Sequence, residues 1–204
     1  MQGDSSLKHI FYPSDASVGL DIGNFSVKVA QIKKRDFHQE KFLSFAVVQI
    51  KGDRSHDRIT EAIKQACLDA ALDSNKVNLS ICGPNIIMRY IILPLMKGTD
   101  FSKSLEFELE KYIPYKKEDV VVDYRILAKL PNNQMVVLLV AAEHRLIQER
   151  INLVQDAGLE PQSINIDALA LMGAFKAVSP HTKGVVALLD IGYRVSKLTV
   201  LEDN

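Results

Sequence analysis

The phrase Leu-Asp-Ile-Gly occurs twice in this chain, once near each end. The first copy begins at Leu20 and the second at Leu189, and in each copy a lysine follows the aspartate seven residues later, at Lys28 and Lys197. An apolar run leads into each aspartate and an alternating apolar run follows each glycine, so each copy predicts a β-hairpin. Two equal hairpins predict a duplicated α/β layout, of which only the first copy is complete.

Between the hairpins, strand and helix patterns alternate. Strands are expected over 18–22, 27–32, 42–50 and 77–82, with a helix over 57–72 that has Asp57 as its N-cap. This order predicts a three-stranded meander and a right-handed crossover to a fourth strand. Residues 143–157 predict a helix that Gly158 closes. A strand over 161–167, a helix over 167–177 and the second hairpin follow.

The block in the middle of the chain has an α+β pattern of its own. An apolar β stretch covers 85–93, a helix covers 101–112, and two strands over 119–130 and 135–141 flank the turn "PNNQ". We therefore expect an inserted subdomain between the two halves of the first layout.

Composition excludes several classes of protein. The 204 residues carry 25 basic and 25 acidic side chains, and this balance argues against nucleic acid as the main partner. No apolar run approaches the roughly 20 residues that cross a bilayer, and the start lacks a signal peptide's apolar core. Cys67 and Cys82 have no CxxC spacing, and both are interpreted as small buried hydrophobes. The expected compartment is the cytosol.

The first hairpin has residues that suit a phosphate site. Asp21 ends an apolar strand, Gly23 tolerates a positive φ, and small polar residues follow. A tight turn of this kind presents backbone N–H groups to an anion, and Ser26 adds a hydroxyl donor. Asp21 could hold Mg²⁺ through its waters. An ordinary hairpin with no ligand is the alternative.

The second hairpin keeps Asp190 but departs after its glycine. Gly192 is followed by Tyr193 and Arg194 in place of small residues. Arg194 either contacts phosphate, which a guanidinium matches in shape, or faces solvent, and the second reading is preferred. Asp167, in the connection between the two halves, is expected to be a helix N-cap.

These motifs resemble a known family. "VGLDIGNFSVK" at 18–28 is similar to the first phosphate hairpin of the actin-like ATPase superfamily, in the bacterial branch that includes PilM and FtsA. "FELEKYIPY" at 107–115, "DVVVDYRIL" at 119–127 and "ALLDIGYRVSKLTVL" at 187–201 resemble the PilM family of type IV pilus assembly proteins. The similarity covers the chain from Val18 to its last residue.

The resemblance implies an actin-like, ribonuclease H-like α/β fold. Subdomain IA is expected over 18–84 plus 143–182, an inserted α+β subdomain 1C over 85–142, and the beginning of subdomain IIA over 183–204, after a flexible segment over 1–17. Family members continue well past this point, so we expect a C-terminally truncated form with an open strand edge at its end.

The resemblance also implies ATP and Mg²⁺ as cofactors, with tight ATP binding not expected from one half of the pocket. Phosphate contacts are predicted at Asp21, Gly23, Asn24, Phe25, Ser26, Lys28, Asp190, Gly192, Tyr193 and Arg194. Asp21 and Asp190 are the predicted water-mediated Mg²⁺ ligands and, with Asp167, the candidate catalytic residues. The resemblance implies that Asp167 positions a water molecule, although its role as an N-cap is preferred. Hydrolysis is less expected than binding.

The implied role is that of a cytoplasmic scaffold, held at the inner membrane only through its partner. That partner is the cytoplasmic N-terminal tail of PilN, in a groove between IA and 1C, and other pilus platform or motor proteins are further partners. Tyr112, Ile113, Pro114, Tyr115 and Arg89 are the predicted contacts, because aromatic residues around a rigid proline suit a peptide. The tail could also add to a strand over 86–93. Alternatively, these aromatics hold 1C onto IA.

Three other functions stay open at this point. The chain could be an active Mg-ATPase with Asp21 and Asp190 at the metal. It could be a cell-division tether of the FtsA type, although the C-terminal amphipathic helix of that protein is absent here. It could also be a type II secretion relative with a degenerate actin fold. Self-association is left undecided by the sequence, because filament formation is an analogy of fold alone.

Overall fold

The computed structural model describes residues 16–35, 39–96 and 98–202. Most of the N-terminal segment that was predicted to be flexible therefore lies outside the described residues. The chain divides into two compact units: the first consists of Met1–Cys82 with Ile151–Asn204, and the second of Gly83–Arg150. The predicted insert over 85–142 falls within the second unit, and the second hairpin belongs to the first unit.

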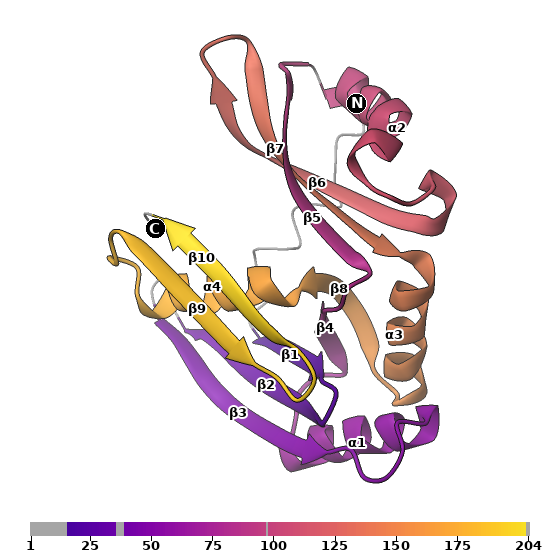
Figure 1. Cartoon of the computed structure of the whole chain (residues 1–204). Coiled ribbons are helices and arrows are strands. Elements are labelled where there is room, and N and C mark those ends of the chain that lie inside the picture. Colours follow the sequence, from indigo (N-terminus) through magenta and orange to yellow (C-terminus); the bar gives the residue numbers. More distant parts are fainter. Residues whose placement is uncertain (1–15, 36–38, 97, 203–204) are drawn as a thin grey trace. The chain divides into compact units, whose positions relative to one another are not determined.

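The first unit contains a five-stranded mixed sheet with the strand order β3-β2-β1-β4-β8 (Figure 1). Its strands are β1 (Ala16–Ile22), β2 (Ser26–Arg35), β3 (Gln39–Gln49), β4 (Lys76–Ile81) and β8 (Glu160–Ile166). The first three strands form an antiparallel meander, whereas β4 and β8 run parallel to β1. Helix α1 (His56–Asp69) makes the crossover from β3 to β4, as the sequence pattern predicted.

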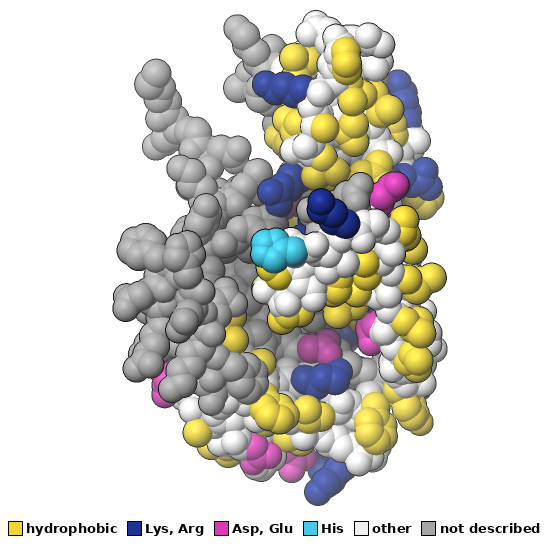
Figure 2. Space-filling model, turned by 90° about the vertical axis from the view of Figure 1, so that its left-hand side faces the viewer, with side chains coloured by type: hydrophobic (Ala, Val, Ile, Leu, Met, Phe, Trp, Pro, Cys, Tyr) yellow, Lys and Arg dark blue, Asp and Glu magenta, His cyan; other side chains and the backbone are white. Residues whose placement is uncertain are grey.

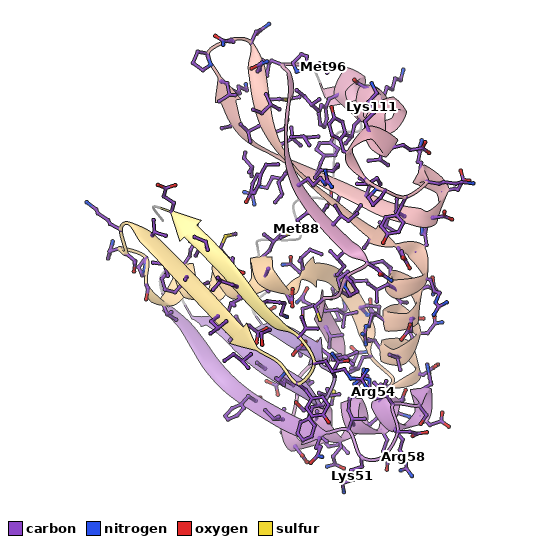
Figure 3. The ribbon with its side chains drawn as sticks, viewed as in Figure 1. Lys51, Arg54, Arg58, Met88, Met96 and Lys111 are labelled. Atoms are coloured by element: carbon purple, nitrogen blue, oxygen red, sulfur yellow. The ribbon has the colours of Figure 1, made fainter. Side chains whose placement is uncertain are left out.

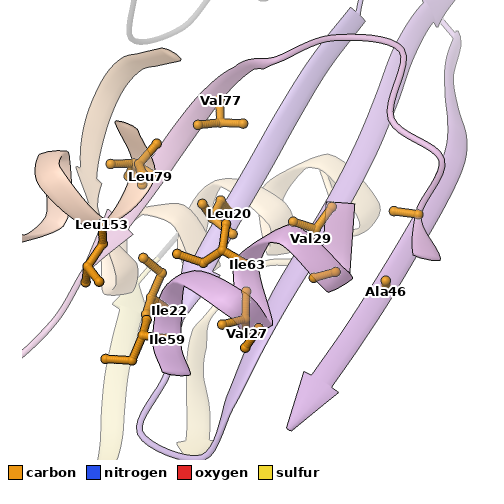
Figure 4. Packing of buried hydrophobic residues seen from close by; sticks show 14 of the residues in the cluster. Leu20, Ile22, Val27, Val29, Ala46, Ile59, Ile63, Val77, Leu79 and Leu153 are labelled. Atoms are coloured by element: carbon orange, nitrogen blue, oxygen red, sulfur yellow. The ribbon is translucent and has the colours of Figure 1, made fainter. Parts of the chain in front are cut away.

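Alternation along the strands gives this sheet one buried apolar face and one exposed face that carries both polar and apolar side chains. Apolar residues of β1, β2 and β4 pack against α1 and against the C-terminal part of α3 (His144–Asp156), as Figure 4 shows. Ile63 of α1 and Val27 of β2 are fully buried in this core. The intervening strand positions, which include Asp21, Lys28 and Ser80, face the opposite side.

Two predicted helix ends have different outcomes. Gly158 follows α3 with a φ of 84°, so its predicted place at the helix C-terminus is confirmed. The predicted N-cap of α1 is wrong, because Ser55 takes that position and Asp57 lies in the first turn. The Ser55 hydroxyl donates to Asp53 at 3.0 Å and makes no side-chain cap. The negative charge of Asp57 in the first turn still interacts favourably with the helix dipole.

The chain then continues through α4 (Asp167–Val178) into a two-stranded sheet of β9 (Val185–Ile191) and β10 (Ser196–Glu202). Within the described residues, β9 and β10 pair only with each other, which leaves the open edges that the sequence predicted. Helix α4 contacts both β8 and β10.

The second unit is a three-stranded antiparallel sheet with the order β5-β7-β6, and α2 (Gly98–Tyr112) lies on one face of it. The strands are β5 (Ile86–Pro94), β6 (Val120–Leu130) and β7 (Gln134–Glu143), and a single 3₁₀ turn (Lys117–Asp119) precedes β6. Phe101 of α2 is buried and packs edge-on against Tyr124, with ring centroids 4.5 Å apart. Among the described residues, no helix is both long and apolar enough to cross a membrane.

Candidate functional site: two matched hairpins

The turn of the first hairpin closes through its glycine. The Gly23 N–H donates to the Ser26 carbonyl at 3.0 Å. A Cβ at Gly23 would lie only 2.9 Å from that carbonyl oxygen, and φ at Gly23 is not positive. The expected reason for this glycine, a positive φ, is therefore wrong: the turn needs a glycine because the backbone approaches itself too closely for a side chain.

The second hairpin repeats this geometry. The Gly192 N–H donates to the Val195 carbonyl at 3.1 Å, and a Cβ at Gly192 would lie 2.8 Å from the same oxygen. In both hairpins the strand register sets the aspartate opposite the lysine, Asp21 against Lys28 and Asp190 against Lys197. The repeated phrase thus folds into the same structure twice.

In the first hairpin, the aspartate and lysine form an exposed ion pair. Lys28 Nζ lies 2.7 Å from Asp21 Oδ2, and Ser80 of β4 donates to Asp21 Oδ1 at 3.3 Å. The two charged side chains are 52% and 40% exposed, so water screens the pair and its contribution to stability is about 0–1 kcal/mol. Lys28 can therefore leave Asp21 for another anion at little cost.

In the second hairpin, the lysine has two carboxylate partners. Lys197 Nζ lies 2.9 Å from Asp190 Oδ2 and also donates to Asp167 Oδ2. Burial lowers the pKa of Lys197, but its hydrogen bonds to Asp167 and Asp190 raise it more, so the net pKa lies well above the ordinary value. The ammonium is charged at neutral pH.

Asp167 is not the N-cap that the sequence predicted. Ile166 is the N-cap of α4, and Asp167 is the first helical residue. Its Oδ1 atom accepts the N–H of Ala168 at 2.7 Å, and its Oδ2 atom accepts from Lys197. Asp167 thus ties α4 to β10.

The tips of the two hairpins touch. The rings of Phe25 and Tyr193 stack with their centroids 5.3 Å apart. Arg54, labelled in Figure 3, donates from Nη1 to the Gly23 carbonyl at 2.7 Å, and Ile50 N–H donates to the Phe25 carbonyl at 2.9 Å. The first tip is therefore held from the side of β3, and the ring stack joins it to the second tip.

The remaining predicted contacts differ in accessibility. Asn24 and Arg194 are exposed at the tips, whereas Ser26 is buried, with 9% of its surface accessible. Sequence reasoning missed Ser80, Arg54 and the ion-pairing of both lysines. The seven-residue spacing carried the signal for the lysines, since a hairpin with this register sets them opposite the aspartates.

A depression of about 640 Å³ lies on the exposed face of the first unit's sheet. Its lining is mostly apolar and includes Phe45 and Val47 of β3. The polar side chains that line it are Asp21, Lys28, Asn78 and Ser80, with Asn165 from β8. Ligands of open α/β sheets bind beyond the carboxyl ends of parallel strands, which is where Asp21, Ser80 and Asn165 lie.

The predicted Mg²⁺ ligands fit a metal ion unequally. The described residues contain no group of three or more His, Cys, Asp or Glu side chains that could hold a metal directly. Asp21 fits a hydrated Mg²⁺, which keeps most of its waters and needs few carboxylates, because its pair with Lys28 is exposed and opens easily. Asp190 does not fit a metal ion while its carboxylate is paired with Lys197.

Comparison with known proteins supplies the family. The model of the family "Type IV pilus assembly protein PilM" matches residues 19–204. The chain belongs to the PilM family. The resemblance found in the sequence is thereby confirmed.

Solved structures agree with this membership. The chain superposes on the PilM-PilN type IV pilus biogenesis complex with a TM-score of 0.78 at 21% identity, covering 92% of this chain and 58% of that chain. It therefore spans little more than half the length of that relative. The cytoplasmic domain of EpsL, an inner membrane component of the type II secretion system of Vibrio cholerae, gives a TM-score of 0.54 at 15% identity, with coverages of 92% and 71%. The predicted actin-like α/β fold class is confirmed.

The predicted partner residues of this PilM family member lie in the second unit. Ile113 is 3% exposed in the core, and Tyr112 and Tyr115 are half-buried against it. Pro114 and Arg89 are exposed. The structure thus gives Ile113 a packing role, and peptide binding by this segment stays a prediction.

Proposed function

We propose that the chain is a scaffold of type IV pilus assembly that binds the extended N-terminal tail of PilN. Membership of the PilM family supports the pilus role, and the partner in the similar PilM-PilN complex supports PilN. In this proposal the protein is cytoplasmic and reaches the inner membrane through PilN. The peptide site is proposed at strand β5, because this strand lies at the edge of its sheet.

Strand β5 is an edge strand with an apolar outer face. It pairs only with β7 in the described sheet, in an unbroken antiparallel register from Ile86 to Pro94. Ile91 and Leu93 point into the core, and Met88, Tyr90 and Ile92 are exposed on the other face. Figure 3 labels Met88, and in Figure 2 hydrophobic side chains gather on the upper part of the face shown, over the second unit.

An extended peptide can add to such an edge as a further strand. Its main chain pairs with the free edge, and its alternate side chains rest on the exposed apolar row. The opposite edge, β6, suits this less well, because its register shifts between Ile126 and Ala128 and it carries Asp123, Arg125 and Lys129. Bulges and charges are the devices that protect an edge from pairing.

The test is a titration of the chain with a synthetic PilN N-terminal peptide, followed by fluorescence anisotropy. Tyr90→Ala and Ile92→Ala should each weaken binding at least about tenfold, because each removes an apolar contact of the kind that dominates peptide interfaces. Leu68→Ala on α1 is the matched control, since Leu68 is 73% exposed and lies in the other unit. A peptide N-methylated at alternate amides should bind only in the register that leaves its pairing N–H groups intact.

A flat titration with demonstrably folded protein would reject the PilN proposal. Equal loss of binding with Leu68→Ala would reject the placement at β5. Binding that is indifferent to N-methylation at every position would show that the peptide does not pair as a strand.

We further propose ATP as a ligand of the first hairpin. The support is Lys28, whose exposed pair with Asp21 opens readily, beside a turn that faces its counterpart across the Phe25–Tyr193 stack. Bound Mg²⁺ would neutralise phosphate charge there, with Asp21 holding it through water. This proposal covers binding and not hydrolysis.

A further inference from the structure

Asp167 and Asp190 converge on one point in the first unit, although they come from different elements. Asp167 is the first residue of α4 and Asp190 lies near the end of β9. Both carboxylates contact the Nζ atom of Lys197, whose side chain is 31% exposed, against 18% for Asp167. Two ionised carboxylates that converge on one point repel each other, and a cation between them relieves this repulsion.

We propose that Lys197 is the resident cation of the second hairpin, and that its ammonium takes the place of a divalent metal ion between Asp167 and Asp190. An ammonium offers three donors from a compact positive charge, and two of these directions are used here. Mg²⁺ requires a nearly octahedral shell at 2.0–2.1 Å, made mostly of water. The ammonium and a hydrated ion of that size cannot occupy the same point.

The local structure holds Lys197 in this place. The strand register sets Lys197 opposite Asp190, so the first contact is built into the hairpin. Asp167 is positioned independently, because its Oδ1 accepts the Ala168 N–H at the positive end of the α4 dipole. The lysine therefore enters a preformed pair of carboxylates and ties the hairpin to α4, as a bridging metal would.

The first hairpin shows what the second carboxylate adds. Among the described residues, Lys28 pairs with one carboxylate, that of Asp21, and both side chains are exposed. Water and salt screen an exposed pair of this kind, so it yields to competing ions. At Lys197 a competing cation would have to displace a partly buried ammonium from two partners at once. The inference concerns the second hairpin alone and does not depend on PilN or ATP binding.

Lys197→Gln tests the inference, because it removes the charge and leaves the two carboxylates facing each other. Electron paramagnetic resonance of free Mn²⁺ measures binding during a titration. In the wild-type chain it should detect no Mn²⁺ binding that Asp190→Asn removes. K197Q should have a lower Tm than wild type, regain Tm when Mn²⁺ is added, and bind Mn²⁺ at least tenfold more tightly. The double variant K197Q/D190N should lose this response.

Lys28→Gln is the matched control, since it frees the single carboxylate of Asp21, and any Mn²⁺ held there should bind less tightly and raise the Tm less than in K197Q. The inference is overturned if K197Q gains no Mn²⁺ binding, or if wild type binds Mn²⁺ and D190N abolishes that binding. If K197Q does not fold with or without Mn²⁺, Mn²⁺ binding by wild type is compared with binding by D190N. Equal binding by the two proteins supports the inference, and weaker binding by D190N overturns it.

Discussion

The ring of Phe25 stacks on the ring of Tyr193, with the two planes inclined by 26°. Phe25 lies two residues after Gly23 and Tyr193 directly after Gly192, so the stack joins the tips of two hairpins near opposite ends of the sequence. Offset aromatic pairs contribute about 0.5–1.5 kcal/mol beyond the area they bury. The stack therefore helps to hold the second hairpin against the first, because the strands of the two hairpins do not pair with each other in the described residues.

A double-mutant cycle should detect this contact. Phe25→Ala and Tyr193→Ala together should destabilise the chain by less than the sum of the single changes, with a coupling of about 0.5–1 kcal/mol, because both rings are partly exposed. Urea unfolding of the four proteins measures it. The pair Leu68→Ala and Tyr193→Ala should be additive, and additivity of Phe25 and Tyr193 as well would show that the stack does not form in solution.

Gly23→Ala should destabilise the first hairpin by about 1–3 kcal/mol, the range of overpacking costs, because the new Cβ meets a backbone oxygen that has no freedom to move away. Gly173→Ala is the matched control. Gly173 lies in α4, where an added Cβ would meet nothing within 4 Å, so alanine should stabilise by up to about 1 kcal/mol through helix propensity. Thermal unfolding compares the two variants, and equal effects would contradict the close approach at Gly23.

Sequence patterns predicted the order of the elements well, because period-two and helical periodicities are local properties. They also predicted two equivalent hairpins, since the repeated phrase carries its own turn. The contact of Lys197 with Asp167 was not predictable in this way, because it joins residues 30 apart through the docking of β10 on α4. A sequence also does not tell whether a turn needs its glycine for a positive φ or for a close approach of the backbone. At Gly23 the structure shows the close approach.

Ile63→Ala should destabilise the first unit by about 2–5 kcal/mol, because Ile63 is fully buried where α1 packs on the sheet and alanine would leave a cavity. Leu68→Ala, on the exposed side of the same helix, should stay within about 0.5 kcal/mol of wild type. Urea unfolding followed by far-UV circular dichroism measures both. Similar losses of stability at the two positions would mean that α1 packs on the sheet with a different face from the one in the structure.

Lys28→Met should weaken ATP binding at least about tenfold while leaving the free energy of unfolding within about 1 kcal/mol of wild type, because the exposed pair with Asp21 contributes little to stability. Isothermal titration with ATP and Mg²⁺ measures the affinity. Lys64→Met, at an exposed position on α1, removes the same charge elsewhere and should not change it. If both variants bind ATP as wild type does, the first hairpin is not the phosphate site.

The ion pairs of Lys197 should make stability depend on alkaline pH. Its pKa is raised in the folded chain above the unfolded value of about 10.4, so the folded state holds the proton more tightly. The stabilisation is therefore complete below about pH 10.4 and declines as the pH rises from there toward the folded pKa. In K197Q this contribution is missing at every pH.

The difference in unfolding free energy between wild type and K197Q should accordingly be constant from about pH 7 to about pH 10 and shrink above it. Urea unfolding at a series of pH values measures this difference directly. Lys64→Gln, measured in parallel, accounts for the general loss of stability at high pH that both proteins share. A difference that grows with pH would mean that folding favours neutral Lys197, and the two carboxylates would then lack the charged partner that the structure gives them.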